Sequence, residues 1–155
     1  MAIRFYTTDD QNVALQGLNI KSLPLKPLKT KQWMCSIAQR YQSEILDLNV
    51  IFCTDKELLK INIDFLSHDY FTDIITFNYS EGNKIHGELY ISVDTVIGNS
   101  KVYNVSFYRE LYRVIIHGLL HLCGEDDQTS LMSESMRNAE DEAIERLSSF
   151  NIMLA

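Results

Sequence analysis

The spacing of apolar and polar residues predicts four strands between residues 2 and 92. Residues 2–7 alternate loosely and are rich in Ile, Phe, Tyr and Thr, which favour strands. A second strand is expected at 48–53, and two further runs at 73–79 and 85–92 are β-rich. Residues 80–83 (SEGN) join the last two runs, and their composition is typical of a hairpin turn.

One helix is expected before the second strand and another after it. Apolar residues recur on one face of 31–43, and Thr30 is expected to cap this helix. Thr54 and Glu57 have the spacing of a capping box, which predicts a helix over 55–66. The buried side of this second helix is expected to carry Leu58, Ile61 and Phe65.

After residue 93 the pattern is helical. Helices are expected near 94–101, at about 106–123 and at about 131–149, and the last of them is acidic. The segment 106–123 is apolar nearly all round, so it is expected to run through the core. No repeat or linker is visible, and 155 residues are the usual size of one domain, expected to span residues 1–155.

Composition favours a globular protein of the cytoplasm. With 46% hydrophobic and 23% charged residues, the chain matches ordinary globular domains and not disordered ones. Its apolar runs are far shorter than the roughly 20 residues that span a bilayer, and its first residues lack a secretory pattern. The three cysteines include no C-x-x-C pair, which disfavours a disulfide framework and a sulfur-ligated zinc site. A reducing compartment without membrane association is expected.

The formal charge of −7 is distributed unevenly. Residues 1–40 carry six basic and two acidic groups, a net +4, so residues 41–155 carry −11. An acidic total disfavours non-specific binding of nucleic acid, because Lys and Arg provide the affinity for phosphates. Any contact with nucleic acid is therefore expected at the cationic end of the chain.

Two histidines in the predicted core helix carry the clearest chemical signal. His117 and His121 are four residues apart, so they lie on one face, where two imidazoles can bind one metal ion. Gly124 follows and can adopt the positive φ that ends a helix and turns the chain back. Asp127 or a neighbouring acid is then available as a third ligand, and catalytic zinc sites use three protein ligands with an open position for water.

Each part of this pattern also has a simpler explanation. A single buried histidine is usually hydrogen-bonded to the backbone, but two unpaired imidazoles in an apolar helix would cost roughly 1–3 kcal/mol each. The acids at 125–127 also fit a solvated turn or a cap of the last helix. Gly118 stands where H-E-x-x-H metallopeptidases carry their general base, which disfavours peptide hydrolysis by that mechanism.

Several motifs resemble those of the YbeY family of bacterial endoribonucleases. HGLLHLCGEDD (117–127) is similar to the family signature H-G-x-L-H-L-x-G-Y-D-H. Residues 62–80 resemble the block N-x-x-Y-R-G-x-D-x-P-T-D-V-L-S-F-P, residues 87–92 the strand G-D-I-x-I-S, and residues 136–144 the family's terminal helix. The resemblance covers about residues 50–145.

The resemblance implies an α+β fold and a metal-dependent ribonuclease. The implied fold is a single domain in which a small mixed β-sheet packs against a helical layer with a buried, zincin-like metal-binding helix. It implies one Zn²⁺ held by His117, His121 and Asp127, where Asp127 replaces the family's third histidine. It also implies cleavage of single-stranded RNA in 16S rRNA 3′-end maturation and ribosome quality control, with small-subunit rRNA and the ribosome as partners.

Two departures from the family pattern affect this site. A carboxylate at Asp127 donates negative charge, so the bound water should be less acidic than at a three-histidine site and Mn²⁺ should compete better. Leu66 stands where the family has arginine, and Phe65 replaces the Tyr beside it, so a group suited to phosphate is missing there. The cations that could replace it from elsewhere in the fold are Lys60, Arg109, Arg113 and Arg137.

The sequence offers further candidates for catalysis and substrate binding. Asp126, which matches the family's aspartate, is expected to transfer a proton or orient a ligand histidine, and Glu88 offers the same chemistry. Trp33 and Tyr41 are candidate stacking surfaces for RNA, although Trp33 also fits the core. Contacts with RNA or the ribosome are expected from Lys26, Lys29 and Arg40.

Other classes of protein share these features. A metallopeptidase would have the same two histidines, a ribosome-associated binding protein would keep the fold without hydrolysis, and a structural zinc module would need a fourth ligand. His68 fits a polar turn, and His86 begins a strand from which it could approach the site. RNA and peptide substrates tested side by side separate the metallopeptidase, and RNA cleavage compared with a His121→Ala variant separates the binding protein. Metal analysis with unfolding in a chelator would reveal a structural zinc module.

Overall fold

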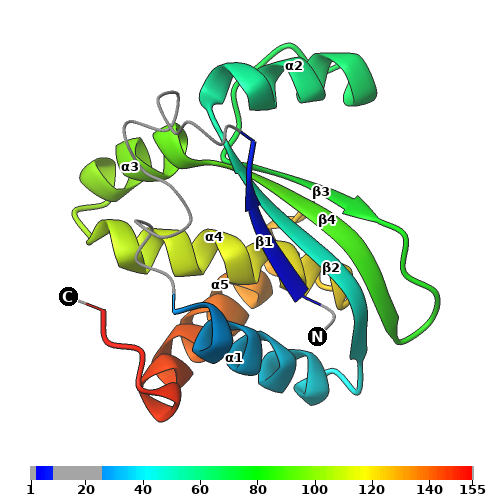
Figure 1. The fold of residues 1–155 in the computed structure, drawn as a ribbon, viewed down its shortest axis with the longest axis vertical. Coiled ribbons are helices and arrows are strands. Elements are labelled where there is room, and N and C mark those ends of the chain that lie inside the picture. The colour runs from blue at the N-terminus through cyan, green and yellow to red at the C-terminus, as the bar shows by residue number, and fades with distance from the viewer. Residues whose placement is uncertain (1–2, 9–25, 155) are drawn as a thin grey trace.

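A four-stranded mixed sheet organises the computed structural model, which describes residues 3–8 and 26–154 (Figure 1). The strands lie in the order β1-β2-β4-β3. Strands β1, β2 and β4 run parallel to one another, and β3 runs antiparallel to β4 at the edge of the sheet. Their bounds are β1 (Ile3–Thr7), β2 (Glu44–Cys53), β3 (Ile74–Asn78) and β4 (Lys84–Ser92).

Helices cover the two faces of the sheet unequally (Figure 1). Within the described residues, one face carries α2, whereas α1 and α4 pack on the other face and α5 packs against α4. The bounds are α1 (Pro27–Arg40), α2 (Asp55–Leu66), α3 (Val93–Val102), α4 (Phe107–Leu122), α5 (Ser130–Glu145) and a final 3-10 turn, η1 (Arg146–Phe150). This arrangement confirms the expected α+β fold with a mixed sheet beside a helical layer.

The expected local signals explain several element boundaries. Thr54 and Glu57 form the capping box at the start of α2, with the Thr54 side chain accepting the Glu57 N–H and the Glu57 carboxylate accepting the Thr54 N–H. Strands β3 and β4 form the expected hairpin, and Gly82 in its turn has φ of 57°. No helix in the described ranges 26–154 is long and apolar enough to cross a membrane.

Two local predictions were wrong, and both errors come from tertiary contacts. Helix α1 begins at Pro27, which needs no N–H partner at a first helical position, so Thr30 lies inside the helix. The Thr30 hydroxyl is buried and hydrogen-bonds the Tyr112 hydroxyl over 3.0 Å instead of capping. Phe65 is 71% exposed, because α2 packs on the sheet through a small cluster around Leu58 that does not include its last turn.

Helix α4 runs through the core, as its apolar pattern predicts, and Gly118 brings it close to the sheet. A Cβ atom at Gly118 would lie 2.7 Å from Ile74 Cδ1 of β3 and 2.8 Å from a Leu89 methyl of β4. The missing side chain at Gly118 therefore lets side chains of two strands pack directly on the helix. The helix and both strands are held at a separation that no larger residue at this position permits.

We expect Gly118→Ala to lower the free energy of unfolding by about 1–3 kcal/mol, because the added methyl overlaps two packed side chains. Urea denaturation monitored by circular dichroism measures this change. Gly98→Ala in α3 is the matched control, since a Cβ there meets nothing within 4 Å. Alanine is the better helix former, so the control should be neutral or stabilising by up to about 1 kcal/mol. Equal effects of the two substitutions would contradict the close-approach explanation.

Candidate metal centre

Helix α4 places the two histidines of the sequence motif against each other. The rings of His117 and His121 are 4.6 Å apart at an angle of 85°, and their Nε2 atoms are 3.0 Å apart. Both side chains are about one quarter exposed, so one edge of each ring faces a pocket while the rest packs in the protein.

The other nitrogen of each ring is held by an acceptor from the protein. His117 Nδ1 lies 2.6 Å from Glu140 Oε2, and His121 Nδ1 lies 3.1 Å from the Glu125 carbonyl oxygen. Carboxylate and carbonyl oxygens accept hydrogen bonds, so both Nδ1 atoms donate and both Nε2 atoms of the neutral rings keep a lone pair. Metal-binding histidines in proteins are oriented by such outer contacts.

The turn after α4 brings a carboxylate to the same place. Gly124 has φ of 105°, as expected for the residue that reverses the chain, and the Glu125 N–H donates back to the Leu120 carbonyl. The chain then returns toward the histidines. Asp127 Oδ2 consequently lies 3.5 Å from His117 Nε2 and 3.6 Å from His121 Nε2.

These three donor atoms fit a single divalent cation. All lie within 4.8 Å of one another, and their separations suit an ion about 2.0–2.2 Å from each. Two imidazole lone pairs and a carboxylate directed at one point also repel one another unless a cation or proton lies between them. His117, His121 and Asp127 could therefore hold a metal ion with an open side toward the pocket.

Glu140 of α5 is a part of the site that sequence reasoning missed. Its side chain is only 7% exposed and also accepts from Arg113 Nη1 over 2.8 Å. Burial raises the pKa of Glu140, but its bonds to His117 and Arg113 outweigh burial and leave that pKa below its ordinary value. A signal existed in the sequence, because Glu140 lies on the same stripe of α5 as the buried Met136 and Ile144. A charged residue in an apolar stripe usually has a partner.

The contact between Glu140 and His117 also alters the pKa of His117. Burial lowers the pKa of His117, yet the hydrogen bond and charge of Glu140 prevail and leave that pKa raised. The imidazole is thus held by a carboxylate that stays ionised.

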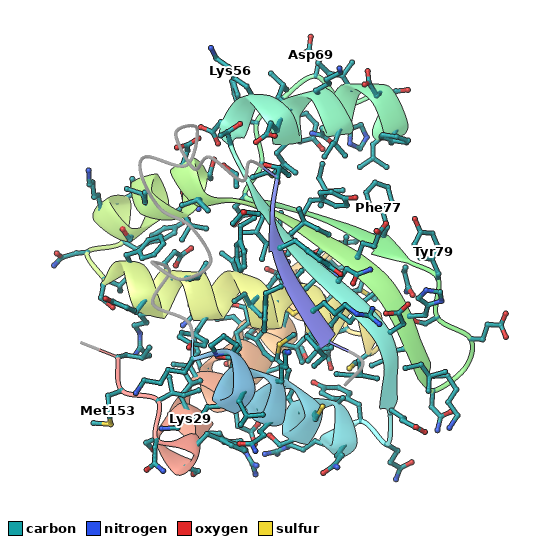
Figure 2. All side chains as sticks on the ribbon, in the orientation of Figure 1. Lys29, Lys56, Asp69, Phe77, Tyr79 and Met153 are labelled. Atoms are coloured by element: carbon teal, nitrogen blue, oxygen red, sulfur yellow. The ribbon has the colours of Figure 1, made fainter. Side chains whose placement is uncertain are left out.

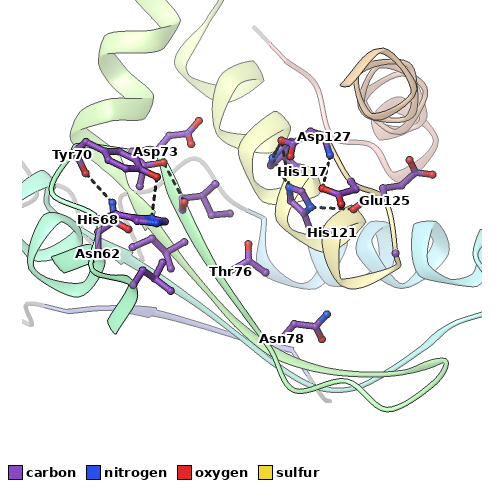
Figure 3. Close-up of a pocket in the computed structure, with 16 residues that line it drawn as sticks. Asn62, His68, Tyr70, Asp73, Thr76, Asn78, His117, His121, Glu125 and Asp127 are labelled. Atoms are coloured by element: carbon purple, nitrogen blue, oxygen red, sulfur yellow. Dashed lines mark hydrogen bonds and ion pairs between the residues drawn. The ribbon is translucent and has the colours of Figure 1, made fainter. Parts of the chain in front are cut away.

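A pocket of about 660 Å³ opens beside the three donors (Figure 3). Its far wall is formed by the end of α2 and the segment leading into β3, including Asn62, His68, Tyr70 and Asp73 (Figure 3). Thr76 and Asn78 of β3 lie between the two walls. The donors thus border a cleft large enough for part of a polymer substrate.

Asp73 is a second residue that the sequence analysis did not single out. It lines the pocket, and burial raises the pKa of its carboxyl group, although the nearby His117 acts in the opposite direction. An acid of this kind can retain a proton that an ordinary aspartate has lost.

The remaining catalytic candidates lie in different places. Asp126 lines the pocket, but its Oδ1 accepts the Asp127 N–H over 2.7 Å and so holds the turn. Glu88 points to the opposite face of the sheet, where the Tyr79 hydroxyl is 3.5 Å away. His86 is exposed on that face, 3.7 Å from an Asp47 oxygen, so it does not approach the site.

His68 does line the pocket. Its Nδ1 atom lies 3.0 Å from the Tyr70 hydroxyl, and the two rings stack 5.2 Å apart. The expected turn contact is therefore present, and it forms part of the pocket wall.

The predicted RNA contacts on α1 are not part of this pocket. Lys26 Nζ lies 3.4 Å from the Asn151 carbonyl, Arg40 forms an ion pair with Glu142, and Lys29 lies on α1 far from α2 (Figure 2). None of the three lines the pocket.

The two aromatic candidates behave differently. Trp33 is fully buried and donates to the Ala143 carbonyl, so it is a core residue, as its alternative interpretation predicts, and not a stacking surface. Tyr41 is half-buried, and its hydroxyl lies 3.3 Å from Glu125 Oε1 in the metal-site turn.

The fold and the site together describe an α+β protein with a candidate metal centre on a core helix. A family model described as Endoribonuclease YbeY matches residues 10–148. An Endoribonuclease YbeY from Bacteroides fragilis is 42% identical over 132 residues, which are 85% of this chain and 95% of the relative. One from Parabacteroides distasonis is 41% identical over 144 residues, 93% and 94% of the two chains. The chain belongs to the YbeY endoribonuclease family.

A solved structure has a similar fold. The solution structure of TM1509 from Thermotoga maritima is 26% identical and superposes with a TM-score of 0.61, covering 95% of this chain and 92% of that one.

We expect Glu140→Gln to weaken metal binding by about 10–100-fold, because the charge that holds His117 is lost. Competition with a chromogenic chelator measures the dissociation constant. Glu142→Gln on the same helix is the matched control, since Glu142 is exposed and pairs with Arg40. Equal metal affinities for the two variants would show that Glu140 does not support the site.

Proposed function

We propose that the chain is a metal-dependent endoribonuclease that cuts single-stranded RNA. The class of enzyme follows from membership of the YbeY family. The observation that carries the metal dependence is the convergence of His117, His121 and Asp127 beside a large pocket. We propose that residues 1–155 form one domain with this activity.

The residues around the site have distinct roles in the proposed reaction. When bound, a divalent ion at such a site polarises a phosphoryl oxygen and supplies hydroxide from water near neutral pH. Glu140 and the Glu125 carbonyl keep the two histidines oriented, and Asp127 adds negative charge. Asp126 keeps the Asp127 turn in place through its backbone contact.

The proton for the leaving ribose oxygen has two candidate sources. Asp126 is the candidate from the family pattern, and Asp73 is the candidate with a raised pKa, caused first by burial. Because the Asp126 carboxylate already accepts the Asp127 N–H, we assign proton transfer to Asp73 and positioning to Asp126.

Asp73→Asn should lower the rate of RNA cleavage by about 100-fold or more, the usual contribution of a general acid, without weakening metal binding. Asp126→Asn should cost less than about tenfold in rate. Single-turnover cleavage of a labelled RNA gives the rates, and chelator competition gives the metal affinities. A larger loss in Asp126→Asn would reverse the assignment.

Zn²⁺ is the proposed ion, with Mn²⁺ as a competitor because of the carboxylate ligand. We expect Asp127→His to increase the preference for Zn²⁺ over Mn²⁺. The same variant should move the rising limb of the pH–rate profile to lower pH, because a neutral imidazole leaves the ion more positive and the water more acidic. Metal titrations and pH profiles of both proteins test this, and an unchanged profile would argue against Asp127 as a ligand.

The proposed biological substrate is the 3′ end of 16S rRNA, in maturation and in ribosome quality control in the cytoplasm. Lys26, Lys29 and Arg40 lie outside the pocket, so they are proposed to contact rRNA or the ribosome at a distance from the cut. Incubation of the purified protein with 3′-extended small-subunit particles tests this substrate, with His121→Ala as the inactive control.

A ribosome-associated protein without hydrolysis is the second candidate function. One observation favours it: Leu66 lines the pocket where the family pattern has arginine, and no Lys or Arg is among the described residues of that pocket. Binding without cleavage in the assay above would support it. A peptidase of the H-E-x-x-H type is disfavoured, because Gly118 packs on Ile74 and Leu89 and leaves no room for a base.

A further inference from the structure

A second, smaller cavity meets the candidate metal centre from the other side. Its volume is about 190 Å³, and it shares Asp73, His117 and Asp127 with the larger pocket. Unlike the larger pocket, it is lined by two arginines, Arg113 of α4 and Arg137 of α5. The cationic side chains next to the donors therefore lie on the side away from Leu66.

The two arginines differ in their exposure and in their contacts within the protein. Arg113 is 17% exposed and binds Glu140 and Asp141 at 2.8 and 2.7 Å, so its charge is already matched. Arg137 is exposed, and in the part of the chain that the structure describes no side chain pairs with its guanidinium. Its donors remain available to a ligand.

A third arginine extends this cationic surface. Arg109 is exposed and lines a neighbouring cavity together with Arg113, Arg137, Tyr103 and Glu110. Within the described residues its guanidinium also has no paired side chain. Arg137 thus lines both the cavity that reaches the candidate metal centre and the neighbouring one that contains Arg109.

The acids of the small cavity leave this surface cationic at its mouth. Glu140 is bonded to Arg113 and His117, and Asp127 and Asp73 also line the larger pocket at the candidate metal site. Glu110 is almost fully buried, and burial raises the pKa of its carboxyl group, although the charges of Arg113 and Arg137 act in the opposite direction. Apart from Asp127, the exposed charged side chains that line the two cavities are therefore those of Arg109 and Arg137.

We propose that Arg109 and Arg137 form a phosphate subsite for RNA, binding a backbone phosphate next to the one that is cut. This inference rests on the proposed ribonuclease function. It places the phosphate contact on the side of the metal centre opposite Leu66, where the family pattern has its arginine. The amide side chains of the larger pocket, Asn62 and Asn78, then face the base and ribose on the other side of the cut.

The experiment compares Arg109→Ala/Arg137→Ala with the unaltered protein in two assays. Fluorescence anisotropy in a chelator measures binding of a short single-stranded RNA without cleavage, and single-turnover cleavage by the metal-loaded protein measures kcat/KM. Each assay is repeated over a range of salt concentrations. We expect the double variant to lose about tenfold in affinity and the salt slope to fall by about 0.7 for each lost phosphate contact.

Two matched controls separate a phosphate contact from a general loss of charge. Arg146→Ala removes an exposed arginine of the 3-10 turn that lines neither cavity, so affinity and slope should stay unchanged. Arg137→Lys keeps the charge, so the salt slope should be retained. A neutral methylphosphonate one linkage from the cut should weaken binding to the unaltered protein and have little further effect on the double variant.

The outcomes distinguish this inference from the proposed function. If the unaltered protein cuts RNA while the double variant keeps its affinity and salt slope, the subsite is wrong and the ribonuclease function stands. If Arg146→Ala weakens binding as much as the double variant, the effect is one of net charge and the subsite is also wrong. An unaltered protein that neither binds nor cuts RNA would overturn both.

Discussion

The site depends on one constraint: both histidines of α4 have their Nδ1 atoms occupied by acceptors of the protein. The Glu140 carboxylate and the Glu125 carbonyl fix which nitrogen of each ring carries the proton and how each ring is turned. The two Nε2 atoms are consequently directed at one point, where the Asp127 carboxylate also arrives. Without these outer contacts, the same two residues would have several ring orientations, and few would converge.

This constraint links elements that are distant in the sequence. Glu140 is held by Arg113 and His117 of α4, so the last long helix cannot shift without disturbing a donor of the site. The Glu125 turn is touched by the Tyr41 hydroxyl from the end of α1. A buried carboxylate that lost either partner would be left uncompensated, so the packing of α5 on α4 and the orientation of His117 depend on each other.

Much of this site was readable from the sequence because its signals are local. The i,i+4 spacing placed His117 and His121 on one face, and Gly124 indicated the reversal that returns Asp127. Glu140 and Asp73 were missed because their role depends on contacts 23 or more residues away, which no local period reveals. Among the fold predictions, Thr30 failed for the same reason, since a cap and a buried partner of Tyr112 look alike in sequence.

The absence of a side chain at Gly118 has an effect beyond packing. This residue follows His117 directly, and its bare backbone touches Ile74, which lies two residues before Thr76 on the strand facing the histidines. Because Gly118 has no side chain, the helix and the edge strand pack directly on each other at this position. An interior contact thus sets how far this strand of the pocket lies from the histidines, so a wider or narrower pocket would require a change in the hydrophobic core.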